Sequence, residues 1–157
     1  MVTSPRRQYH SAMRYRDILF GGTGGGSWLA DLGLMLLRGF TGVAMAVYHG
    51  ADKMKNPGKV VDSADDMGFP APFVFGWLAV FAEFFGGVLL ALGLATRPAA
   101  FLLSCTMATA AFIAHAGDRF PTREKALLYL FISVLFMLIG SGRYGLDALL
   151  RGRGKKS

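Results

Sequence analysis

The chain has 157 residues, of which 53% are hydrophobic and 17% are charged, and its mean hydropathy is +0.41. A soluble domain of this size could not keep so much apolar surface out of water, so the composition excludes an ordinary soluble protein and indicates an integral membrane protein. The net charge of +7 is concentrated at the two ends of the chain, which is typical of segments that flank a membrane and does not favour a nucleic-acid partner.

Four apolar stretches predict an all-α fold. Residues 1–27 are polar, bear arginines and end in GGTGGGS, which predicts a flexible basic tail. Residues 28–150 are predicted to form one transmembrane domain, because each stretch approaches the ~20 residues that cross a bilayer. The predicted helices cover residues 29–48, 73–94, 98–115 and 125–140. Residues 151–157 are predicted to form a basic C-terminal tail.

The connections predict an antiparallel up-down bundle. A polar loop is predicted over residues 51–72, while only residues 95–97 join the second helix to the third. Lysines and arginines are more numerous on the side that holds the two termini than on the opposite side, which predicts that both termini are cytoplasmic. The terminal side carries Arg6, Arg7, Arg14, Arg16, Arg97, Arg143, Arg151, Arg153, Lys155 and Lys156. The opposite side carries Lys53, Lys55, Lys59, Arg119, Arg123 and Lys125.

Glu83 is the ionisable residue placed deepest in a predicted span. It lies roughly 15 Å along the second helix at 1.5 Å per residue, near the bilayer midplane. Ala79 and Gly87 share its face at a spacing of four residues. A charge at this depth costs at least ~2.5 kcal/mol on insertion scales. Two interpretations stay open: a neutral or paired carboxyl that joins helices, and a ligand-binding or proton-handling group.

Further polar residues are predicted at the non-cytoplasmic end of the bundle. His49 ends the first helix, His115 ends the third, and Lys53 and Glu124 lie near them, with Glu83 below. Each could be an interfacial side chain of no special function. Together they predict a ligand site, in which Glu83 and His115 are the candidates for proton transfer. Arg38 is expected to pair with Glu83 or with a backbone carbonyl.

The residue types at this end suit some ligands better than others. Histidine and a buried glutamate can hydrogen-bond the carbonyls of a quinone and exchange protons near neutral pH. Two histidines on separate helices could also ligate haem, but nothing else in the sequence marks a porphyrin pocket, so haem is not favoured. Cys105 is the only cysteine, which excludes a CxxC pair and a thiolate site, and no metal is expected.

Several motifs together resemble the DoxX family over about residues 30–150. They are HGxxK at 49–53, GFPAP at 68–72, AEFFGGVLLALGLATR at 82–97, AFIAH at 111–115 and GSGRYGLD at 140–147. The positions that match the family pattern are His49, Lys53, Glu83, Arg97, His115, Glu124, Arg143 and Asp147. One departure is Gly145, where the family often has serine; the expected effect is the loss of a local cap.

The resemblance implies a multi-pass protein of the bacterial inner membrane, and some family members are associated with membrane oxidoreductase systems that include electron transfer to quinone. The leading hypothesis is therefore a small membrane subunit of a redox system that contacts quinone through His49, Lys53, Glu83, His115 and Glu124, or anchors an oxidoreductase partner. Structural roles are expected for Arg38, Arg97, Arg143 and Asp147. The sequence has no self-contained catalytic motif, so whether the protein is an enzyme stays open.

Two alternatives remain. One is a non-enzymatic assembly protein whose polar groups fix helix packing, and the other is a transporter of a small solute or protons. Both would share the lipid bilayer as the main partner, and both are compatible with a homo-oligomer.

Overall fold

The computed structural model describes residues 28–153, and all regular structure in this range is helical. The predicted all-α class is confirmed, while the predicted tail over residues 1–27 lies outside the described residues. In chain order the elements are α2 (Trp28–Ala44), the π-helical segment η1 (Met45–Gly50), α3 (Ala51–Lys55), α4 (Pro57–Asp66), α5 (Pro72–Leu92), α6 (Thr96–Thr109), the π-helical segment η2 (Ala110–Ala114), α7 (Phe120–Ile139) and α8 (Leu146–Arg153).

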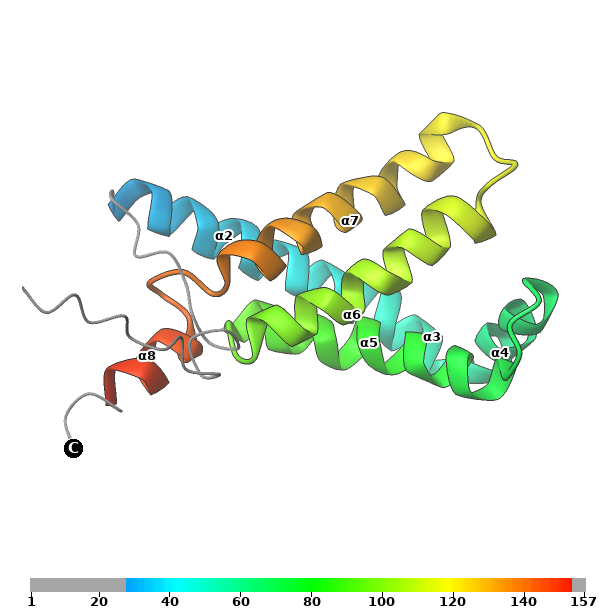
Figure 1. The fold of residues 1–157 in the computed structure, drawn as a ribbon, viewed down its shortest axis with the longest axis horizontal. Coiled ribbons are helices and arrows are strands. Elements are labelled where there is room, and N and C mark those ends of the chain that lie inside the picture. The colour runs from blue at the N-terminus through cyan, green and yellow to red at the C-terminus, as the bar shows by residue number, and fades with distance from the viewer. Residues whose placement is uncertain (1–27, 154–157) are drawn as a thin grey trace, which may run out of the picture.

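Four long helical runs in this range alternate in direction along the chain (Figure 1). The first is continuous from Trp28 to Lys55 through η1, and the third is continuous from Thr96 to Ala114 through η2. The start of α2, the α5–α6 turn and α8 lie at one end of the molecule, and the α6–α7 connection and α4 lie at the other (Figure 1). The first run and α5 pack together along their length, and α7 packs mainly on α6.

Small residues set the close approach of the first run to α5. A Cβ on Gly42 would lie 2.4 Å from the Ala91 backbone nitrogen, and one on Gly87 would lie 2.7 Å from that of Ala46. Neither position can hold a larger residue without moving a backbone, so the glycines let the two helices meet backbone to backbone. The remaining core is apolar and lies between η1, α5, α6 and α7. Its buried members are Met45, Leu90, Ala100, Leu103, Met107 and Phe136.

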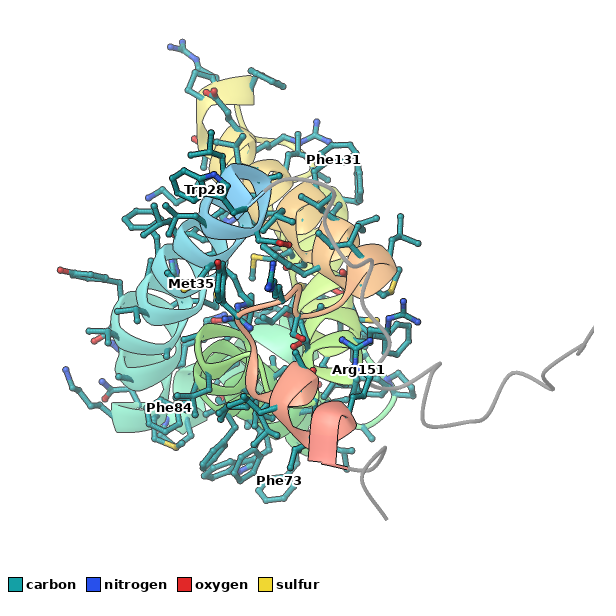
Figure 2. The ribbon with its side chains drawn as sticks, turned by 90° about the vertical axis from the view of Figure 1, so that its left-hand side faces the viewer. Trp28, Met35, Phe73, Phe84, Phe131 and Arg151 are labelled. Atoms are coloured by element: carbon teal, nitrogen blue, oxygen red, sulfur yellow. The ribbon has the colours of Figure 1, made fainter. Side chains whose placement is uncertain are left out.

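Much of the outer surface is apolar, as expected for contact with lipid. Trp28, Phe73 and Phe131 project outward in Figure 2, and more than 60% of the surface of each is exposed. Three helical runs are long and apolar enough to cross a membrane, namely Trp28–Lys55, Pro72–Leu92 and Thr96–Ala114. A contiguous exposed apolar surface of this extent marks a membrane protein.

The fourth run, α7, is not among the membrane-crossing helices. Arg123, Glu124 and Lys125 stand near its start, so its apolar part runs only over residues 126–139. At 1.5 Å per residue that part is about 21 Å long, shorter than the ~30 Å hydrocarbon core. The predicted fourth transmembrane helix, the four-helix membrane bundle and the cytoplasmic termini therefore stay predictions.

Two segments predicted as irregular are helical. The predicted loop over residues 51–72 contains α3 and α4. Val61 and Ala64 lie on one face of α4 and make that face apolar. That side packs on the start of α5, where a Cβ on Gly76 would lie 2.8 Å from the Val61 Cα. The predicted C-terminal tail begins inside α8, which continues to Arg153, while residues 154–157 lie outside the described range.

The α5–α6 turn needs two left-handed residues. Gly93 ends α5 with φ of 67°, a conformation that glycine adopts without a Cβ penalty. Ala95 follows with φ of 45°, which is strained for a residue with a side chain. Such a turn persists when its surroundings hold it, and here the segment that follows α7 does so.

Candidate functional site

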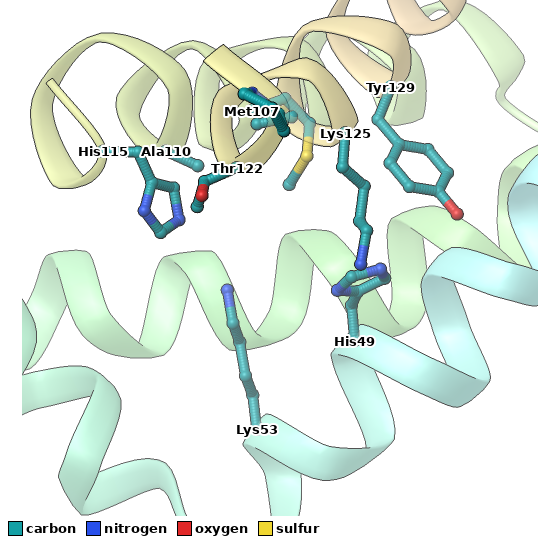
Figure 3. A pocket seen from close by; sticks show the side chains of 10 residues that line it. His49, Lys53, Met107, Ala110, His115, Thr122, Lys125 and Tyr129 are labelled. Atoms are coloured by element: carbon teal, nitrogen blue, oxygen red, sulfur yellow. The ribbon is translucent and has the colours of Figure 1, made fainter. Parts of the chain in front are cut away.

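A cavity of about 370 Å³ opens between the C-terminal part of the first run and the α6–α7 hairpin (Figure 3). Its volume lies within the range of small-molecule sites. The cavity is lined by His49, Lys53, Met107, Ala110, His115, Pro121, Thr122, Lys125, Ala126 and Tyr129. It thus joins three of the predicted site residues, His49, Lys53 and His115, at one place.

Two of the three helical runs that border the cavity, the first run and the α6–η2 run, contain a π-helical segment there. Segment η1 carries His49 at its last turn, and η2 ends one residue before His115. A π turn adds one residue to the helical repeat and changes the face on which the following side chains lie, and such turns are frequent at functional sites. Arg123 holds η2 against the start of α7, because its Nε donates to the Ala111 carbonyl oxygen at 3.1 Å.

Gly50 brings the end of η1 onto α5 beside Glu83. A Cβ on Gly50 would lie 2.5 Å from the Phe84 Cα and 2.8 Å from the Glu83 carbonyl carbon, so only glycine fits. One turn later, Lys53 Nζ donates to Glu83 Oε1 at 2.5 Å. The close backbone approach therefore places the lysine over the carboxylate.

The ion pair links the buried interior of the protein to the cavity. The Glu83 side chain is 1% exposed and does not line the cavity, whereas the Lys53 side chain is 37% exposed and does. Glu83 Oε2 is buried and has no hydrogen-bond partner. A buried carboxylate oxygen without a partner can accept a further hydrogen bond.

His49 and two residues of α7 form the wall opposite His115. The His49 ring meets the Tyr129 ring edge-on, with centroids 5.5 Å apart. The Lys125 side chain extends into the cavity toward His49 (Figure 3). Sequence reasoning treated Lys125 as a flanking charge and overlooked Tyr129. Their spacing of four residues, which puts both on one helix face, was the available signal.

The remaining predicted ligand residues are placed differently. His115 lines the cavity, and its Nδ1 lies 2.8 Å from Asp118 Oδ2 in the following turn. Glu124 is exposed on α7 and is not among the lining residues. Its neighbour Lys125 faces the cavity instead, because adjacent residues of a helix point about 100° apart. Across residues 28–153, no group of three or more His, Cys, Asp and Glu side chains gathers as a metal site would require.

The residues predicted to be structural gather at the opposite end, in an assembly that we call the clamp: Arg38, the α5–α6 turn and residues 141–147. The Asp147 carboxylate accepts hydrogen bonds from the backbone N–H groups of Ala95 at 2.7 Å and Thr96 at 3.0 Å. The Asp147 N–H in turn donates to the Gly93 carbonyl oxygen at 2.8 Å. These three bonds hold the left-handed turn in place.

Arg38 reaches the clamp from the first helix. It is buried, and its Nη2 donates to the Tyr144 carbonyl oxygen at 3.3 Å, so of the two expected partners the backbone carbonyl is observed and Glu83 is not. A Cβ on Gly145 would lie 2.6 Å from Arg38 Nη1 and 2.3 Å from the Ser141 Cβ. Gly145 therefore leaves space for the side chains of Arg38 and Ser141. The expected effect of glycine at this position was only the loss of a local cap.

The other two residues with expected structural roles lie at the margin of the clamp. Arg97 Nη2 donates to the Leu138 carbonyl oxygen at 3.0 Å, which joins the start of α6 to the end of α7. Arg143 is exposed between α7 and α8.

The helical fold, the membrane-crossing runs and the apolar surface define a small multi-pass α-helical membrane protein. The sequence model of the DoxX family matches residues 33–116, more than half of the chain, and the protein belongs to this family. The match includes His49, Lys53, Glu83 and His115 and ends before α7.

A protein of Haemophilus influenzae described as uncharacterized is 36% identical over 111 residues, which cover 66% of this chain and 80% of that protein. No solved structure matches the chain.

Proposed function

We propose that this DoxX-family protein is a small membrane subunit of a redox system and that it binds a quinone headgroup in the cavity. The observation that supports this most is the convergence of His49, Lys53, Lys125 and Tyr129 on one 370 Å³ space beside membrane-crossing helices. A quinone is delivered through the lipid, and a site at the end of such helices is accessible to it.

The lining fits the chemistry of the ring. Each quinone carbonyl accepts a hydrogen bond, and donors are present on two sides of the cavity, in Lys53 on the first run and in Lys125 and Tyr129 on α7. Met107, Ala110 and Ala126 supply apolar contacts for the ring face.

The lining also suits proton exchange with the ligand. His49 and His115 carry imidazole rings, a group that can donate and accept protons at a ligand site. The Lys53–Glu83 pair extends this set of groups into the membrane interior. These side chains supply protons and hydrogen bonds, so we assign the supply of electrons to an oxidoreductase partner that the protein would anchor or contact.

For the membrane arrangement we propose four transmembrane helices with both termini in the cytoplasm of a bacterial inner membrane. The alternating direction of the four runs supports this, and so does the position of α2's start and α8 at the same end (Figure 1). The cavity would then open at the outer side of the membrane.

Binding of short-chain quinones to the purified protein in lipid nanodiscs tests the proposal. Menadione and ubiquinone-1 should bind, and His49→Ala and Tyr129→Ala should weaken binding about tenfold or more, since each removes a wall of the cavity. Tyr48→Ala is the matched control, because Tyr48 is the neighbour of His49 and is 78% exposed, away from the lining. A protein that binds neither quinone would refute the proposal.

One observation favours a role in helix assembly for some of these residues. The Lys53–Glu83 pair and Gly50 join the first run to α5, so these residues also hold the helices together. His115→Ala separates the two functions, because His115 lines the cavity but contacts only the adjacent turn through Asp118. Under the quinone proposal the variant loses electron transfer and keeps its melting temperature. Under the assembly alternative it keeps electron transfer, and stability falls in the Glu83→Gln variant alone.

A further inference from the structure

The cavity lining carries basic side chains and no carboxylate. Its ionisable members besides Tyr129 are His49, Lys53, His115 and Lys125. Two of these have acidic partners outside the lining, since Lys53 pairs with Glu83 and His115 pairs with Asp118. Among residues 28–153, Lys53 and His115 therefore have acidic partners, and Lys125 does not.

Lys125 is the unbalanced cation. Within residues 28–153 it has no ion pair and no hydrogen bond, and the adjacent Glu124 does not line the cavity. Its side chain extends inward toward His49 rather than outward along the surface (Figure 3). The apolar stretch of α7 begins at the next residue, Ala126, so the ammonium group stands where the helix passes from polar to apolar surroundings.

A lysine in such a place attracts a negative partner. Lys125 is exposed, and its ammonium group gains more from an anionic oxygen than from a neutral carbonyl, because Coulomb attraction between opposite charges adds to the hydrogen bond. His49 stands beside it and can donate a second hydrogen bond to the same ligand.

We propose that the cavity selects ligands that carry a negative charge on the headgroup, with the anionic oxygen held by Lys125 and His49. This inference rests on the proposed function and narrows it: among quinones, the site prefers acidic ones, such as 2-hydroxy-1,4-naphthoquinone, which is an anion at neutral pH. The neutral 2-methoxy-1,4-naphthoquinone has nearly the same shape and lacks the charge.

The two compounds are compared by titration of the full-length protein in phosphatidylcholine nanodiscs at neutral pH. The hydroxy compound should bind at least about tenfold more tightly than the methoxy compound. Lys125→Met should abolish the difference, and Lys125→Arg should preserve it, which shows that loss of charge and not misfolding is the cause. Lys59→Met is the matched control, because Lys59 is exposed on α4 and does not line the cavity.

Equal binding of the two compounds would overturn the charge selectivity, and so would a difference that persists in Lys125→Met. Menadione binding separates this failure from failure of the proposed function: if menadione also fails to bind, both are wrong, and if it binds, only the selectivity is wrong. A repeat in phosphatidylglycerol nanodiscs tests a second source of negative charge. Loss of the preference there would show that a lipid phosphate occupies Lys125 and would overturn the assignment to quinone.

Discussion

The two ends of this helical protein differ in how their polar groups are used. At the clamp, Asp147 accepts hydrogen bonds from two backbone N–H groups of the α5–α6 turn, and Arg38 is enclosed by Gly93 and Gly145. At the other end, the helices that carry His49 and His115 diverge around a cavity, and Lys125 faces it without a partner among the described residues. The polar groups of the first end bond to the chain itself, whereas several polar groups of the second end line a cavity.

This difference indicates that the two ends of the protein have different roles. Backbone groups in lipid must be satisfied within the protein, and the clamp does so for a turn that would otherwise expose strained backbone. Because that end is fixed, the opposite end can keep a cavity and an incompletely paired carboxylate, which by themselves lower stability.

Asp147→Ala should destabilise the protein more than any change at the cavity. The substitution leaves the Ala95 and Thr96 N–H groups without the carboxylate that they bond, and hydrogen bonds to charged groups contribute roughly 1.5–3 kcal/mol each. We expect a loss of about 3–5 kcal/mol, measured by thermal unfolding in detergent. Asp66→Asn, on the exposed side of α4, is the control and should change little. An Asp147→Ala protein as stable as the control would remove the basis for the clamp.

Lys53→Met should destabilise by about 2 kcal/mol. Removing one partner of a buried pair costs roughly 3–5 kcal/mol, and the partial exposure of Lys53 reduces this figure. The informative measurement is the unfolding of the double variant Lys53→Met with Glu83→Gln, because the second substitution removes the carboxylate that Lys53→Met leaves unpaired. We expect the double variant to be more stable than Lys53→Met alone. Additive losses would show that the two side chains act independently.

Gly50→Ala should destabilise by about 1–3 kcal/mol, since the new Cβ would meet the α5 backbone at 2.5 Å. Gly33→Ala is the matched control on the same helix, because nothing lies within 4 Å of its Cβ position. There the better helix propensity of alanine should raise stability by up to ~1 kcal/mol. Chemical denaturation of the two variants, measured under the same conditions, compares their free energies of unfolding. The same sign for both changes would contradict the backbone-to-backbone packing of the first run on α5.

Arg123→Met should have the smallest effect on stability, about 1 kcal/mol, because it removes one hydrogen bond to the Ala111 carbonyl at the edge of the protein. It should nevertheless weaken quinone binding, since that bond fixes η2 beside the cavity. Quinone titration and thermal unfolding of the same preparation compare the two effects. Unchanged binding would show that the π-helical segment does not need this contact.

Much of the fold follows from local sequence patterns. Long apolar stretches predicted all four long runs, and the three-residue connection over residues 95–97 predicted the α5–α6 hairpin that is observed. The helical part of the predicted 51–72 loop was not recognised, because the Gly and Pro residues at its ends are typical of loops and the Val61 face is short. The apolar part of α7 is short because of three charged residues: Arg123 and Glu124, which precede the predicted helix, and Lys125, its first residue.

The site was predictable only in part, for a geometric reason. His49 and His115 could be placed at one end because each terminates a predicted helix, and Lys53 follows His49 by one turn. Which residues of α7 face the cavity depends on helix rotation, and a shift of one residue exchanges Glu124 for Lys125. The π-helical segments rotate the neighbouring faces further, and no periodicity in the sequence reveals them.

Photoaffinity labelling with an azido-quinone tests most directly that the cavity end binds the ligand and the clamp end holds the fold. The labelled protein would be digested and its peptides mapped, with and without excess menadione. We predict label on residues 45–55 and 107–129, which border the cavity, and its loss when menadione competes. Label on the clamp residues 93–97 or 141–147, or label spread over the outer surface and insensitive to menadione, would contradict this division between the two ends.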